Sequence, residues 1–167
     1  MTPPHQDRDS PLAEAVALRT ADRTEEARQR LLALVGRFPD DAEIAYQTAW
    51  AHDRLGLEAE AVPYYERALA GQLSATDRRG ALLGLGSTLR VLGRYEEAVR
   101  TLRSGTAEFP ADGALKTFLA MALFNVGEHH EAMQLLLALL AESSDDEGVR
   151  QYRAAIAHYA KDLTEVV

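Results

Sequence analysis

A glycine followed five residues later by an alanine recurs along this chain, and its spacing constrains the fold more than any other feature. The copies are Gly56 with Ala61, Gly93 with Ala98 and Gly127 with Ala132, and Asp22 with Ala27 is a fainter copy that lacks the glycine. These alanines lie 34, 37 and 34 residues apart. A period of about 34 residues is typical of repeats that each contain two helices joined by a turn. The spacing therefore indicates about four such repeats.

Residues 81–110 show this repeat in its most complete form. Apolar or small residues stand three or four positions apart in both halves of the segment, as they do on one face of a helix. Gly93 separates the two halves, because the residue after a helix often needs a left-handed backbone, which glycine adopts at little cost. Gly86 and Ala98 are small where two antiparallel helices are expected to cross. Phe109-Pro110 ends the segment.

The chain resembles the tetratricopeptide repeat (TPR) family over roughly residues 8–146. The family's signature residues match Leu85-Gly86, Gly93, Tyr95, Ala98 and Pro110, with Gly56, Ala61, Tyr65 and Ala68 in the copy before and Leu119-Ala120, Gly127 and Ala132 in the copy after. The resemblance implies an all-α, right-handed superhelix of about four helix pairs. The repeats would cover about residues 8–41, 42–75, 79–112 and 113–146.

The two ends of the array are predicted separately. Residues 1–9 combine two prolines and three charged residues without periodicity, which predicts a flexible tail. A stack of repeats leaves its last apolar face uncovered, so a capping helix over about 146–161 is expected to cover that face. Residues 10–161 are then predicted to form a single TPR-like domain.

Capping and proline signals predict where individual helices begin. Ser10-Pro11 indicates the start of the first helix, and Asp40 with a glutamate three residues later indicates a capping box before the third. Pro63 inside a helix would remove one backbone hydrogen bond, so the fourth helix is predicted to begin later than the family pattern suggests. Ser74 offers a cap for the fifth helix, and the segment around it holds the three extra residues of the 37-residue spacing.

Composition and charge exclude several classes of protein. Cysteine is absent, which excludes disulfides, thiol nucleophiles and cysteine-based metal sites. No stretch is long and apolar enough for a transmembrane helix, and the first ten residues lack the apolar core of a secretory signal, so we expect a cytoplasmic protein. The net charge of −8 makes nucleic acid and membrane surfaces poor partners. Sixteen arginines against two lysines indicate a GC-rich bacterial genome.

The resemblance also implies where a partner would bind, because the first helix of each repeat lines the concave surface of the superhelix in this family. By position, this surface would carry Tyr46, Trp50 and Asp53, then Leu83, Ser87 and Arg90, then Thr117, Met121, Phe124 and Asn125. Tyr46 and Trp50 are four residues apart and share a helical face. Exposed tryptophan, tyrosine and arginine are enriched among residues that carry binding energy. The alternative is that several of these side chains belong to the core.

The predicted function is therefore protein–protein interaction, with the concave groove holding a peptide or a partner helix. The carboxylate clamp with which some family members hold chaperone tails is not expected, because its positions carry Leu12, Val16, Trp50, Leu83 and Ser87. Self-assembly into a homodimer, with the groove or the C-terminal helix buried, is the second hypothesis. A small-molecule or nucleic-acid sensor is the third and least favoured.

No enzyme activity, metal site or cofactor is predicted. His129 and His130 are adjacent, and adjacent residues on a helix point about 100° apart, so they cannot converge on one ion. Gly84 and Gly86 lie inside a predicted helix and so do not form a phosphate-binding loop, which follows a strand.

Overall fold

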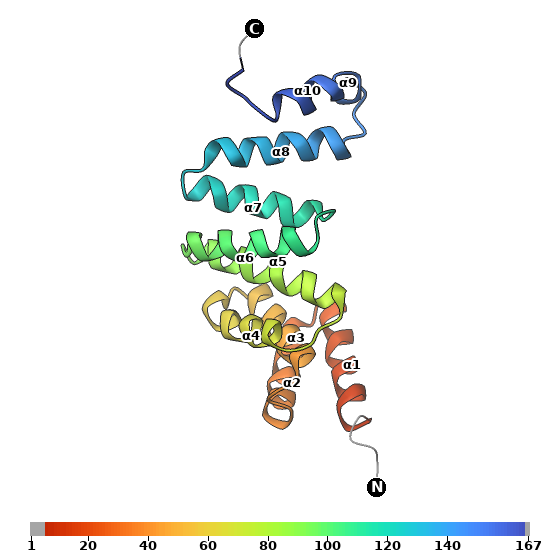
Figure 1. Ribbon diagram of the computed structural model, residues 1–167. Helices are drawn as coiled ribbons and strands as arrows, with labels where there is room; N and C mark the ends of the chain where they lie inside the picture. Colours follow the sequence, from red (N-terminus) through yellow and green to blue (C-terminus); the bar gives the residue numbers. More distant parts are fainter. Residues whose placement is uncertain (1–5, 166–167) are drawn as a thin grey trace. The chain divides into compact units, whose positions relative to one another are not determined.

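The computed structural model describes residues 6–165, and this part of the chain is built from ten α-helices without a strand. The helices are α1 (Gln6–Thr20), α2 (Thr24–Arg37), α3 (Ala42–Arg54), α4 (Glu58–Ala70), α5 (Ala75–Val91), α6 (Tyr95–Glu108), α7 (Gly113–Asn125), α8 (His129–Ser143), α9 (Glu147–Gln151) and α10 (Arg153–Tyr159) (Figure 1). None of these helices is long and apolar enough to cross a membrane.

The helices group into two compact units that divide between Leu92 and Gly93. Unit 1 contains α1–α5, in which consecutive helices pack against each other, and α3 also contacts α5. Unit 2 contains α6–α10, in which α7 packs between α6 and α8 and α10 packs on α8. Each unit has its own internal packing, and the prediction of a single domain over 10–161 stays a prediction.

The repeated glycine and alanine mark the turns between paired helices, as predicted. Gly56, Gly93 and Gly127 have φ angles of 72°, 74° and 87°, so each needs the left-handed backbone that glycine adopts readily. Asp22 takes the same conformation with φ 59°, and aspartate is among the few other residues that tolerate it. The alanine five residues later is buried in all four copies, with exposed fractions of 0–4%. The fainter first copy is therefore a true member of the series.

The first helix begins earlier than predicted. α1 starts at Gln6, so the predicted start at Ser10-Pro11 is wrong and Pro11 lies inside the helix. The Arg8 side chain donates a hydrogen bond of 2.5 Å to Asp41 and another to Glu43, both at the start of α3. These bonds hold the first turn of α1 against α3. Residues 6–9 of the predicted tail are thus helical, and residues 1–5 lie outside the described part.

Two further predictions about helix ends are wrong, and one is confirmed. α4 begins at Glu58 and tolerates the exposed Pro63 in its second turn, because buried side chains on both sides of the proline hold the helix in place. Asp41, not Asp40, caps α3, accepting a hydrogen bond of 2.9 Å from the Ile44 amide. Ser74 caps α5 as predicted.

The predicted capping helix over 146–161 is two short helices, α9 and α10, which meet at Tyr152. Neither helix contains a buried residue, so little packing energy holds them as one continuous helix. In Figure 1 they lie beside α8, on the side away from α7.

Glycines on α5 allow two tyrosines of unit 1 to approach this helix closely. Tyr65, on α4, is only 1% exposed, and its hydroxyl lies 2.4 Å from where a β-carbon on Gly84 would stand. Tyr46, on α3, lies equally close to Gly80, and its ring centroid is 6.5 Å from that of Tyr65. This packing joins α3, α4 and α5 and fixes one side of the surface described next.

Candidate partner-binding surface

Trp50 stands half-buried on α3 and is held by a side chain from α1. The Arg19 guanidinium lies 4.4 Å from the centre of the Trp50 ring, within the range of a cation–π interaction. Arg19 also donates a hydrogen bond of 2.6 Å to the side-chain oxygen of Gln47, which precedes Trp50 by less than one turn. Arg19 therefore holds the indole, and Gln47 holds Arg19, before a partner binds.

Asp53 lies one turn after Trp50, and it is also half-buried. Its carboxylate accepts a hydrogen bond of 3.2 Å from the buried Tyr65 hydroxyl. Burial raises the pKa of Asp53, because the ionised form loses contact with water. Trp50, Asp53 and Arg54 together line a shallow hollow of about 270 Å³. The hollow thus offers an aromatic edge, an acceptor and an exposed cation within two turns of α3.

The raised pKa of Asp53 predicts a dependence of stability on pH. The Asp53 carboxylate ionises more readily in the unfolded chain than in the folded protein. The free energy of unfolding therefore falls as the pH rises from the pKa of Asp53 in the unfolded chain to its higher pKa in the folded protein. Asp53→Asn, which keeps an acceptor for Tyr65, should therefore give a small increase in melting temperature at pH 7. The gain should shrink as the pH falls toward 4.

Thermal melts of both proteins between pH 4 and pH 8 check this. Asp145→Asn is the control. Asp145 is exposed, so this substitution removes the same charge without changing a buried group. A gain from Asp53→Asn that stays constant across the range would contradict the assignment.

The other predicted site residues of unit 1 are only partly accessible. Tyr46 packs against Gly80, and burial raises the pKa of its hydroxyl, so this ring belongs as much to the packing of α3 on α5 as to the surface. Leu83, Ser87 and Arg90 are half-buried on α5. The Nε atom of Arg90 is buried and has no hydrogen-bond partner within the described residues. The alternative raised from the sequence was that some of these side chains belong to the core, and it fits Tyr46 best.

The predicted site residues of unit 2 are on α7. Met121 and Phe124 are exposed, at 40% and 61%, and the Phe124 ring lies 4.6 Å from that of His129. Asn125 is also exposed, whereas Thr117 is half-buried and donates a hydrogen bond of 2.7 Å to the Gly113 carbonyl. That these residues share one trough with those of unit 1 stays a prediction.

Sequence reasoning missed two contributors to the surface of unit 1. Gln47 positions Arg19, and Arg54 lines the hollow beside Asp53. Both could have been found from their spacing to Trp50, since residues three or four apart share a helical face.

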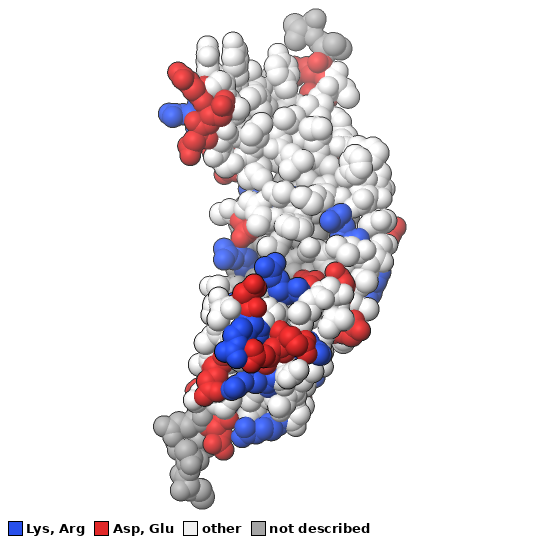
Figure 2. Space-filling view, turned by 180° about the vertical axis from the view of Figure 1, so that it is seen from behind, with Lys and Arg blue, Asp and Glu red and all other residues white. Residues whose placement is uncertain are grey.

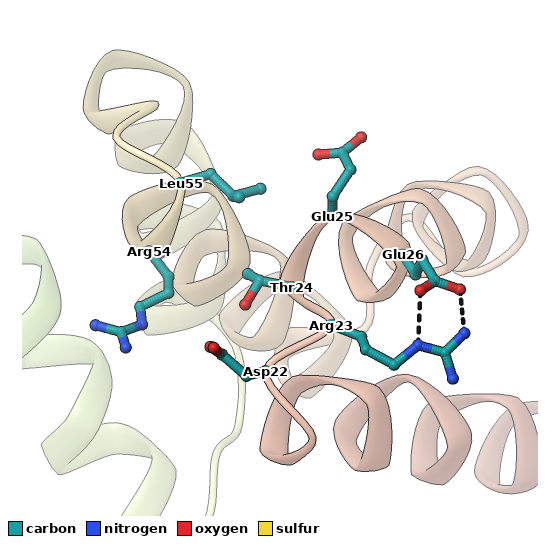
Figure 3. Close-up of a pocket in the computed structure, with 7 residues that line it drawn as sticks. All are labelled: Asp22, Arg23, Thr24, Glu25, Glu26, Arg54 and Leu55. Carbon is teal, nitrogen blue, oxygen red and sulfur yellow. Dashed lines mark hydrogen bonds and ion pairs between the residues drawn. The ribbon is translucent and has the colours of Figure 1, made fainter.

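A larger hollow of about 560 Å³ lies beside the α1–α2 turn and the end of α3 (Figure 3). Part of its charge is already paired: Arg23 donates two hydrogen bonds to Glu26, as the dashed lines show. The Arg28 guanidinium lowers the pKa of Glu25 to about 2 and so satisfies that carboxylate from outside the hollow. Because three charged side chains of this larger hollow are already paired and its lining holds no aromatic ring, the Trp50 hollow is the better candidate despite its smaller volume.

The comparisons with known proteins agree with this architecture. The family model described as "Tetratrico peptide repeat" matches residues 42–163, more than half of the chain. Among curated proteins, no sequence matches this chain.

Solved structures resemble the fold at low sequence identity. YrrB, titled a TPR protein with an unusual peptide-binding site, has a TM-score of 0.74 at 19% identity, covering 97% of this chain and 81% of its own. pilF of Pseudomonas aeruginosa has a TM-score of 0.68 at 19% identity, covering 95% and 71%. MamA of AMB-1 has a TM-score of 0.69 at 19% identity, covering 87% and 83%. These likenesses confirm the predicted all-α fold built from TPR-type helix pairs.

Proposed function

The chain belongs to the tetratricopeptide repeat family, and from this premise we propose that it binds a peptide or a helix of another protein on the face formed by α1, α3 and α5. The family generally serves as a non-enzymatic scaffold for protein–protein interaction. The observation that carries the proposal is Trp50, held half-buried by Arg19 at the edge of a hollow. The exposed Met121 and Phe124 on α7 are proposed as further contacts.

The geometry around Trp50 supports this role in energetic terms. Binding orders side chains, and each mobile side chain that becomes fixed costs about 0.5–1.5 kcal/mol. Trp50 is already fixed by Arg19, and Arg19 by Gln47, so much of this cost is met when the protein folds. Tryptophan is among the residues most enriched in the small set that dominates binding energy at interfaces.

Trp50→Ala is expected to weaken partner binding by about 2 kcal/mol, close to thirtyfold in affinity, because tryptophan is a frequent hot-spot residue. Affinity capture from a lysate of the native organism, followed by titration of each captured protein, measures this. Tyr159→Ala is a matched control, since it removes an exposed aromatic ring from unit 2. A Trp50→Ala protein that melts normally and binds its partner with unchanged affinity would contradict the proposal.

Self-assembly is the alternative that the sequence raised, and light scattering at several concentrations tests it. A strict monomer across the range argues against a homodimer. If capture returns only the protein itself and light scattering shows a dimer, self-assembly becomes the better explanation.

A further inference from the structure

One position of the repeat is buried in the first three copies and exposed in the fourth. The residue four positions after the repeated alanine is Leu31, Tyr65, Leu102 and Leu136 in the four copies. The first three are 0–1% exposed, whereas Leu136 is 39% exposed. An apolar side chain at a position that is otherwise fully buried indicates that the last copy is covered less completely by the described helices.

The covering element in the earlier copies is the next helix along the chain. α3 packs on α2, α5 on α4 and α7 on α6, and each of these covering helices has 13–17 residues. On α8 the same place is taken by α9 and α10, which have 5 and 7 residues and bury none of their own side chains. The short pair therefore leaves part of α8 open.

The open part of α8 is a continuous apolar stripe. Met133, Leu136 and Leu140 are 50%, 39% and 42% exposed and stand three and four residues apart, so they share one helical face. We call these three residues the α8 stripe. Apolar residues at this spacing form the contact face when one helix packs against another.

The segment of the sequence that contains the α8 stripe is strongly acidic. Residues 128–147 contain no lysine or arginine, and their acidic members are Glu128, Glu131, Glu142, Asp145, Asp146 and Glu147. Three of these carboxylates already accept hydrogen bonds: Glu131 from Arg103, Glu142 from Lys116 and Asp146 from the Val149 amide. On the face shown in Figure 2, much of unit 2 is free of charge, and a red cluster with one blue side chain at its edge lies near its upper end.

We propose that the α8 stripe is a docking surface for a basic amphipathic helix of another protein. The apolar face of that helix would cover Leu136 as α3, α5 and α7 cover the equivalent residues in the other repeats. Its lysines or arginines would meet the exposed Glu128 at one end of α8 and the exposed Asp145 and Glu147 beyond the other end. A second copy of this chain fits less well, because two α8 helices placed side by side would bring their acidic ends together.

The test uses the full-length protein and two synthetic helices with the same leucine face. One is the labelled peptide LKKLLKLLKKLLKL, and the other replaces every lysine with glutamate. Fluorescence anisotropy measures binding to wild type and to Leu136→Ser/Leu140→Ser. Leu55→Ser is the matched control, since Leu55 is exposed to the same extent, at 37%, but belongs to unit 1. Thermal melts confirm that each variant is folded.

We expect the lysine peptide to bind wild type and Leu55→Ser equally and the double variant about tenfold more weakly. Raising the salt concentration should weaken binding, because the attraction involves exposed charges. Equal binding by the double variant would overturn the site, and equal binding of the glutamate peptide would overturn the basic partner. A wild-type dimer that Leu136→Ser/Leu140→Ser dissociates would assign the stripe to a second copy instead. Trp50→Ala should leave peptide binding unchanged, which separates this surface from that on α1, α3 and α5.

Discussion

Gly84→Ala is expected to lower the free energy of unfolding by about 1–3 kcal/mol, although alanine is the better helix former. The added β-carbon would stand 2.4 Å from the Tyr65 hydroxyl oxygen and 2.5–2.7 Å from two ring carbons. Tyr65 is 1% exposed and its hydroxyl is bonded to Asp53, so the ring has little room to move. The helix α5 would have to shift away from α4 to make space.

Gly36→Ala provides the control within the same unit. Gly36 lies near the end of α2, and a β-carbon there would meet nothing within 4 Å. Alanine at this position should raise stability by up to about 1 kcal/mol through helix propensity alone. Urea denaturation of the two variants and wild type measures both effects. If Gly84→Ala were as stable as Gly36→Ala, the close contact between Gly84 and Tyr65 would not exist in solution.

Leu102→Ala is expected to have the other large effect, a loss of about 2–5 kcal/mol. Leu102 is 0% exposed on α6, and α7 packs on that helix. Truncation to alanine removes buried methyl groups and leaves a cavity, since close-packed neighbours relax only in part. The same urea denaturation experiment measures the loss.

Leu136→Ala makes the same chemical change at the same position of the last repeat. It should cost no more than about 1 kcal/mol, because 39% of that residue is already in contact with water. The difference between the two variants thus measures how much of the α8 face is covered in the free protein. Equal losses would show that Leu136 is buried in solution, and the α8 stripe would then not be available to a partner.

The sequence predicted the number and pairing of the main helices well because the turns depend on local backbone chemistry. A left-handed residue at Gly56, Gly93 and Gly127 can be recognised without knowing any tertiary contact. Helix starts were less predictable where distant residues intervene. The start of α1 depends on bonds from Arg8 to residues 33 and 35 positions away, and no local signal contains that information.

The site was predictable to a similar degree. Helical spacing placed Tyr46, Trp50 and Asp53 on one face of α3, and the structure brings Trp50 and Asp53 to one hollow. The sequence could not show that Tyr46 packs against Gly80, since that contact joins two helices 34 residues apart. Gly86, predicted to be the small residue at a helix crossing, is buried on α5, but the close approach of Tyr65 to Gly84 was not predicted. Which glycine of α5 lies against a given side chain depends on the orientation of the neighbouring helix, which the sequence does not show.

Trp50 is the only tryptophan of the chain, and it lies directly under a guanidinium. When only tryptophan is excited, the emission of the protein therefore comes from one indole at the proposed contact surface. A partner that displaces Arg19 or covers the ring changes the polarity around this fluorophore, and the emission maximum shifts accordingly. The protein thus carries its own optical reporter, and a partner's arrival at the α1, α3 and α5 face can be followed in real time without any label.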